Sequence, residues 1–204
     1  MTEFDKALAD LAHIRTRLAA GMLFQGFGPA AIAATGLLAF ATAEAQALWP
    51  DLLTRSQETY LVIWIALAFA AAALVGIEMI ARSRRRHGGL STAMIVNAIE
   101  QFLPAGFAGA AVAAVFVSAS PEDCWMLPGL WQLFVALGIF AALRCLPRTV
   151  VLAGAWYFLS GTAVLLLASE EKVLSPWLMG LPFGAGQLLM AVALHFAEGE
   201  SDVR

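Results

Sequence analysis

Residues 176–196, PWLMGLPFGAGQLLMAVALHF, decide the fold that this sequence predicts. The stretch contains no Asp, Glu, Lys or Arg. At 1.5 Å per residue, about 20 apolar residues in a helix cross the roughly 30 Å hydrocarbon core of a bilayer. The stretch opens with a proline and with Trp177, a residue type enriched at membrane interfaces. It therefore predicts a membrane-spanning helix, with Gln187 and His195 as its polar exceptions.

The composition extends this prediction to the whole chain. Of the 204 residues, 61% are hydrophobic and 13% are charged. In soluble domains about 45–50% of the residues are apolar and about 25% are charged. The charges lie in short runs between apolar stretches. We therefore expect an all-α polytopic membrane protein with six spans, near 22–43, 60–81, 98–118, 127–146, 149–168 and 176–196.

The expected organisation has three parts. A cytoplasmic amphipathic helix occupies 1–21, a six-helix transmembrane domain occupies 22–198, and a cytoplasmic tail occupies 199–204. The third span has an alternative, because 90–101 is only half apolar and would also suit an interfacial helix that turns into the span near Pro104. The many Ala and Gly residues of the spans favour close helix packing and predict a bundle with few large cavities.

The orientation follows from the basic residues, which concentrate in cytoplasmic loops of membrane proteins. With a cytoplasmic N-terminus, ten of the twelve Lys and Arg residues fall on the cytoplasmic side, and only Arg55 and Lys172 fall on the other. Trp49, Trp125 and Trp177 then all lie at the non-cytoplasmic interface. Both termini are expected to be cytoplasmic.

The N-terminal segment has helical periodicity. Phe4, Leu8 and Leu11 recur at spacings of three and four, and His13 and Arg15 follow among polar residues. This pattern is typical of a helix that lies on the membrane surface. It equally suits an extension that docks a cytoplasmic protein, and these five residues are the candidates for that contact.

The six spans group into three similar hairpins. The segment from Pro29 to Trp49 resembles that from Pro104 to Trp125, and the surroundings of Gln132 resemble those of Gln187. We therefore expect three related helical hairpins inserted in one orientation. General similarity among Ala- and Gly-rich membrane helices is the alternative explanation.

Polar and ionisable residues inside spans are costly in lipid and are the default candidates for function. Among such residues we single out six that together suit a polar pocket open to the cytoplasm: Glu78, Asn97, Glu100, Gln101, Gln187 and His195. Each ionisable one has a simpler explanation. Glu78 lies one turn from Arg82 and suits an ion pair, Glu100 suits an interfacial helix face, and His195 suits a helix end.

No feature of the sequence predicts an enzyme. Phosphate-binding, dinucleotide-binding, nucleophile-elbow and zinc-protease motifs are missing, and the loops between the spans are too short for a catalytic domain. Metal sites need several grouped ligands, so we expect no metal and no cofactor. The basic run 83–87 serves topology, and no nucleic-acid partner is expected.

Two segments carry a resemblance to a known group. SPWLMGLPFGAGQLL at 175–189, with DLAHIR at 10–15, resembles a family of small, uncharacterised bacterial six-span integral membrane proteins. Some members are encoded beside winged-helix regulators. The resemblance implies a bacterial inner-membrane location and a sensing or regulatory role, and it implies no active site.

Three functional hypotheses follow, of which an intramembrane enzyme or haem protein that uses His195 has the least support in the sequence. The first is a non-enzymatic membrane module, sensing, regulatory or accessory, that acts through contacts with lipid, with a cytoplasmic protein or with a second copy of the chain. The alternative is a small-molecule or proton-coupled transporter that uses the polar pocket. It places the most weight on Glu100.

Overall fold

The structure is a computed structural model that describes residues 28–85, 89–143 and 146–202, with side chains for 28–81, 100–143 and 146–197. These residues form α-helices and two short 3-10 helices, and no strand occurs among them. The α-helices are α2 (Pro29–Leu48), α3 (Pro50–Leu53), α4 (Gln57–Arg85), α5 (Gly89–Ala119), α6 (Leu127–Ala142), α7 (Val151–Glu171) and α8 (Pro176–Asp202). The 3-10 helices η1 (Pro121–Met126) and η2 (Arg148–Val150) precede α6 and α7. Six segments are long and apolar enough to cross a membrane, which confirms the expected six spans: they lie in α2, α4, α5, η1 with α6, η2 with α7, and α8.

The observed spans differ from the expected ones mainly at their ends. The first spanning helix extends to Leu48, and the fourth span begins with η1 at Pro121. The third span belongs to one continuous helix, α5, which passes through Pro104. The helix is not interrupted at Pro104, and the alternative that residues 90–101 lie at the membrane interface stays a prediction. A helix can accommodate one proline because only one backbone N–H is lost and neighbouring groups can bond the freed carbonyl.

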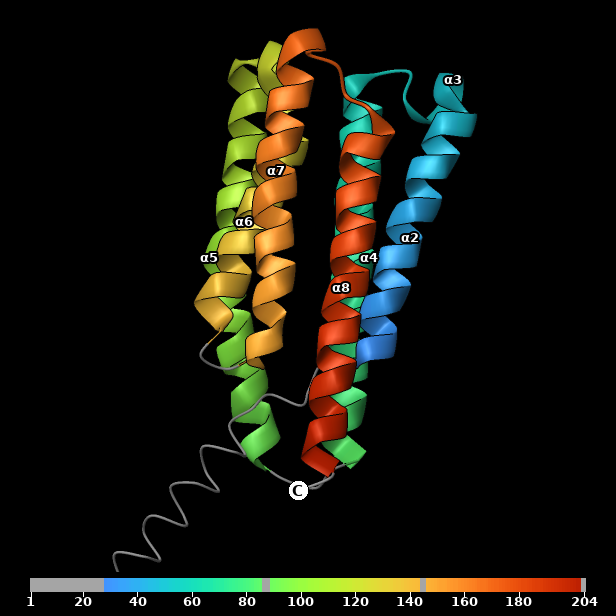
Figure 1. The fold of residues 1–204 in the computed structure, drawn as a ribbon. Coiled ribbons are helices and arrows are strands. Elements are labelled where there is room, and N and C mark those ends of the chain that lie inside the picture. The colour runs from blue at the N-terminus through green and yellow to red at the C-terminus, as the bar shows by residue number, and fades with distance from the viewer. Residues whose placement is uncertain (1–27, 86–88, 144–145, 203–204) are drawn as a thin grey trace, which may run out of the picture.

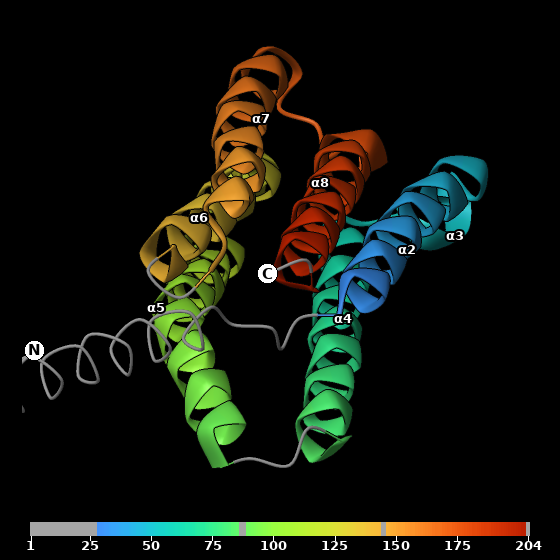
Figure 2. The same ribbon diagram turned by 60° about the horizontal axis from the view of Figure 1, so that its bottom comes forward.

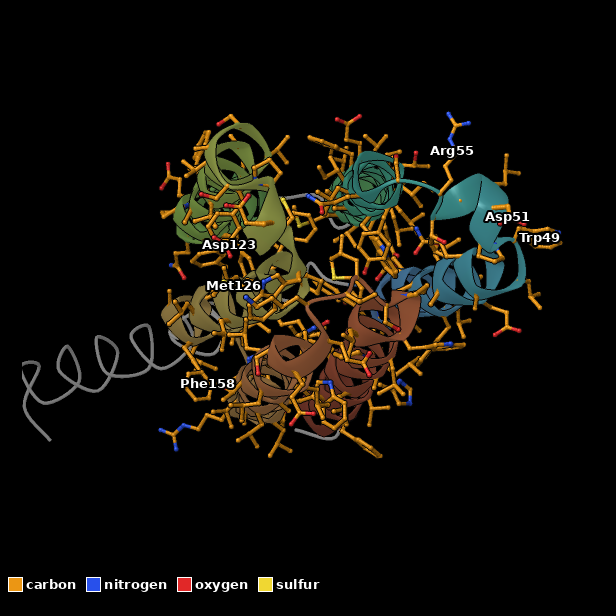
Figure 3. The ribbon with its side chains drawn as sticks, turned by 90° about the horizontal axis from the view of Figure 1, so that it is seen from above. Trp49, Asp51, Arg55, Asp123, Met126 and Phe158 are labelled. Atoms are coloured by element: carbon orange, nitrogen blue, oxygen red, sulfur yellow. The ribbon has the colours of Figure 1, made fainter. Side chains whose placement is uncertain are left out.

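The long helices stand side by side in an open ring (Figure 1). Around the ring the order is α4, α2, α8, α7, α6 and α5, and neighbours in this order pack against each other. One end, drawn at the top of Figure 1 and called the upper end here, holds α3, η1 and residues 172–175. Trp49 and Arg55 point away from the bundle at this end (Figure 3). The ring is incomplete between α4 and α5, which stand apart along most of their length (Figure 2).

Glycines set the tightest helix contacts. A Cβ atom on Gly129 of α6 would lie 2.8 Å from the Gly161 carbonyl oxygen of α7. In the same way, a Cβ atom on Gly161 would lie 2.8 Å from the Gly129 carbonyl oxygen. Along α8, a Cβ on Gly184 would lie 2.5 Å from the Phe40 ring of α2. Side chains at these positions would force the helices apart. Small residues therefore bring α2 against α8 and α6 against α7, as is typical of membrane helices.

The three expected hairpins are not the units of tightest packing. Helix α2 packs along α8, at the other end of the chain, far more extensively than along α4. The expectation of three repeated hairpins stays a prediction. The expected N-terminal amphipathic helix, with Phe4, Leu8, Leu11, His13 and Arg15, lies outside the described residues.

Candidate functional site: a cavity between α4 and α5

A cavity of about 540 Å³ lies inside the ring. Its volume falls within the range of about 300–1,000 Å³ that is typical of ligand sites. Side chains of α2, α4, α5, α6, α7 and α8 line it, and none of the lining residues that the structure describes is charged. Helix α4 supplies the longest wall, which consists largely of small and aliphatic residues: Ala68, Ala71, Ala72, Val75, Gly76 and Met79. The expectation of a bundle with few large cavities is therefore corrected, because α4 and α5 do not close on each other.

The cavity is open to the side, between α4 and α5. Ala68 and Ala72 line it and yet are exposed, and a Cβ on Gly76 would meet no atom within 4 Å. In the apolar spans of α4 and α5, 17% and 11% of the residues are buried, against 33–44% in the other four. The side opening of a membrane-spanning bundle faces lipid. Within the described part of the structure, the cavity is thus open towards the side that would meet the hydrocarbon phase of a bilayer.

The upper end of this opening is closed. Gln57 Nε2 at the start of α4 donates a hydrogen bond of 2.8 Å to the Pro121 carbonyl oxygen of η1. Just inside, Tyr60 and Trp64 of α4 belong to a buried apolar cluster with Ala113 of α5 and Leu127 of α6. The Trp64 indole N–H donates to Gln46 Oε1 of α2 at 2.9 Å. Helices α4 and α5 are thus held at the upper end and separate below it.

Three polar side chains line the cavity, and the structure brings them from three helices: Thr35 of α2, Tyr157 of α7 and Gln187 of α8. The Gln187 side chain lies beside the Tyr157 hydroxyl. That hydroxyl donates to the Phe183 carbonyl oxygen at 3.3 Å. The Thr35 hydroxyl donates to the Ile32 carbonyl oxygen at 2.7 Å. We call these three residues the polar corner.

Glycines position the polar corner. A Cβ atom on Gly186 would overlap the Tyr157 ring, so glycine at this place lets the ring lie across α8. A Cβ on Gly36 would lie 3.0 Å from the Gln187 Cβ and 2.9 Å from the Gly184 carbonyl oxygen. The close approach of α2 to α8 therefore fixes the place of Gln187 in the cavity wall.

The polar corner lies near the middle of the membrane-spanning segments. Gln187 is the twelfth of the 22 residues of its span, and Tyr157 is the tenth of 24. Thr35 is the seventh of 20. Polar groups at this depth are surrounded by hydrocarbon, where every unsatisfied hydrogen-bonding group is costly.

The structure describes the side chains of five of the six residues that the sequence singled out, and of these five only Gln187 lines the cavity. Glu100 is exposed and Gln101 is half-buried on α5. Asn97 lies in α5, and its side chain is outside the described part of the structure. His195 is exposed on α8, with its ring 6.1 Å from that of Phe196. The structure therefore does not gather the five described side chains around one pocket.

Glu78 has a particular place at the lower end of the bundle. Its carboxylate lies against Gly28, where any side chain would overlap it. Gly28 immediately precedes the first residue of α2. Helix N-termini carry a partial positive charge and unpaired backbone N–H groups, so this carboxylate stabilises the start of α2 and joins it to α4.

Sequence reasoning missed Thr35 and Tyr157, which share the cavity wall with Gln187. Both carry a hydroxyl group within an apolar span. Tyr157 lies in the middle third of its span, and Thr35 lies at the border of the middle third of its span. A search for ionisable groups passes over hydroxyls, because they are tolerated in membrane helices. A systematic search for all hydrogen-bonding side chains at mid-span depth would have found them.

Comparison with known proteins gives no match that adds to these observations. No protein-family model, no curated protein and no solved structure matches the chain. Among the described residues, no group of three His, Cys, Asp or Glu side chains is placed to hold a metal ion. The geometry of the cavity is thus the basis for a functional proposal.

Proposed function

We propose that this protein is a non-enzymatic integral membrane module that admits an uncharged lipid chain sideways, from the bilayer into the cavity between α4 and α5. One observation carries the proposal: a 540 Å³ cavity, with no charged residue among its described lining, is open between the two spans that have the smallest buried shares. A sensing, regulatory or accessory role follows if the lipid alters the separation of α4 and α5.

The alternative of a proton-coupled transporter has less support. That hypothesis relies on a carboxylate inside a polar pocket, and the exposed Glu100 does not line the cavity. Proton relays in membranes use ionisable side chains that face the bundle interior. Gln187 is polar but does not titrate, so it suits binding better than proton transfer.

The cellular setting belongs to the same proposal. The resemblance to small six-span proteins supports a bacterial inner-membrane location, and the distribution of Lys and Arg supports cytoplasmic termini. Trp49, Trp125 and Trp177 all lie at the upper end, which supports an interface there. Within this arrangement the N-terminal segment docks on lipid or on a cytoplasmic partner, and a second copy of the chain remains a candidate partner.

The test uses a phospholipid with a photoreactive group in its acyl chain, with the full chain reconstituted in vesicles. Ile139 and Tyr157 line the cavity and are only 1% exposed, so a lipid labels them only from within the cavity. We expect mass spectrometry to find label on both residues. Labelling confined to outward-facing residues such as Phe69 and Phe107, which are 73% and 68% exposed, would contradict the proposal.

A matched pair of variants sharpens this test. A Cβ on Gly76 or on Gly106 would meet no atom within 4 Å, but only Gly76 lines the cavity. Gly76→Phe should fill part of the cavity and reduce the labelling of Ile139 several-fold. Gly106→Phe adds the same ring to the same open side and should leave that labelling unchanged.

A further inference from the structure

We infer that the polar corner selects the lipid: the cavity prefers an uncharged lipid that carries a carbonyl group part way along its chain, and Gln187 donates the hydrogen bond that recognises it. This inference rests on the proposed function and names the class of ligand for the same cavity. It begins from the physics of a site that exchanges its contents with lipid.

A purely apolar molecule gains little by entering the cavity. Lipid tails are as apolar as the cavity wall, so no hydrophobic effect drives the transfer. A carbonyl group is different, because in the hydrocarbon phase it finds no hydrogen-bond donor. A donor inside the cavity therefore provides an advantage that the surrounding lipid does not.

Gln187 is the group that can supply this donor. The hydroxyl protons of Thr35 and Tyr157 are already engaged by backbone carbonyls, at 2.7 and 3.3 Å. The Gln187 amide carries two N–H groups, and the neighbouring Tyr157 oxygen can accept from only one of them. At least one N–H of Gln187 is therefore available to a ligand in the cavity.

The lining and the depth of the corner restrict the ligand further. None of the described lining residues is charged, so a carboxylate or phosphate group finds no counter-ion among them, and burying a charge without one is strongly unfavourable. Charged headgroups also remain at the membrane surface, whereas Gln187 is near the middle of its span. These conditions suit a ketone, quinone or ester carbonyl within an otherwise apolar molecule.

The experiment is a competition against the photoreactive lipid, read out as label on Ile139, with the full chain in vesicles. The competitors are hexadecane, its mid-chain ketone and the C16 fatty-acid anion, each compared at equal mole fraction in the bilayer. A hydrogen bond in a membrane interior is worth enough to make the ketone effective at about 5- to 30-fold lower concentration than the alkane. Gln187→Leu removes the amide and should abolish this preference. Gln187→Met also removes the amide but has an unbranched side chain, so the same loss in both variants excludes an effect of side-chain shape.

The outcomes separate the two proposals. Equal competition by alkane and ketone in the unaltered protein, or a preference that survives both Gln187 variants, would overturn the role of the polar corner and leave the lipid-binding cavity in place. A stronger effect of the fatty-acid anion would overturn the preference for an uncharged ligand. Failure of the photoreactive lipid to label Ile139 at all would overturn the proposed function itself.

Discussion

The two sides of the bundle are built from similar residues but packed differently. On the closed side, formed by α2, α6, α7 and α8, glycines face backbone or bulky side chains of a neighbouring helix, as Gly129 and Gly161 do. On the open side, formed by α4 and α5, Gly76 and Gly106 face no atom within 4 Å. The comparison shows that small residues permit close packing in lipid but do not enforce it.

The closed side also has a set of polar contacts around the proline of α8. Pro182 of α8 has no backbone N–H, so the Leu178 carbonyl oxygen, four residues earlier, loses its helical partner. Gln132 of α6, which is fully buried, donates its amide N–H to that oxygen at 3.0 Å. Trp156 of α7 donates to the Pro182 carbonyl oxygen at 2.9 Å. On the closed side, buried polar groups thus link neighbouring helices at the proline.

The largest expected effect comes from adding a side chain to the closed side. In Gly129→Leu, the new Cβ would lie 2.8 Å from the Gly161 carbonyl oxygen, and overpacking of this kind costs about 1–3 kcal/mol. Gly76→Leu on the open side should leave the free energy of unfolding nearly unchanged. The free energy of unfolding of both variants can be measured by adding SDS to protein in a mild detergent. Equal decreases in the two variants would contradict the difference in packing between the two sides.

A smaller effect is expected from the amide that bonds the freed carbonyl. Gln132→Leu leaves the Leu178 oxygen without its donor and should lower the free energy of unfolding by about 1–2 kcal/mol. In the Pro182→Ala background the helix regains its own N–H donor, so the same substitution should cost much less. A cost of Gln132→Leu that is equal in both backgrounds would show that the proline is not the reason for the contact.

The sequence predicted the six spans because their length and apolar character are local properties of the chain. Residues 176–196 illustrate this, since the structure places that span at Pro176–Ala197. Gln187 was also singled out, because an amide is conspicuous in an apolar run. The place of a helix in the ring is not local, and nothing in the sequence of α2 alone indicates that Gly36 meets α8 rather than α4.

The same limit explains why the sequence did not predict the candidate site. Glu100 was preferred because a carboxylate in a span is costly, but its exposure depends on which face of α5 turns towards the ring. Thr35 and Tyr157 became relevant only when α2, α7 and α8 came together around Gln187. The cavity itself exists because α4 and α5 do not meet, and Ala- and Gly-rich sequences suit close packing and separation equally.

The central claim, that lipid enters the ring between α4 and α5, is tested most directly by the fluorescence of Trp64. This residue is only 3% exposed but lines the cavity, and its emission is obtained as the difference between the unaltered protein and Trp64→Phe. In vesicles of lipids brominated in the acyl chain, we expect that emission to be quenched, and the quenching to weaken in Gly76→Phe but not in Gly106→Phe. Trp64 emission that is unaffected by brominated chains, while the exposed tryptophans are quenched, would contradict the account.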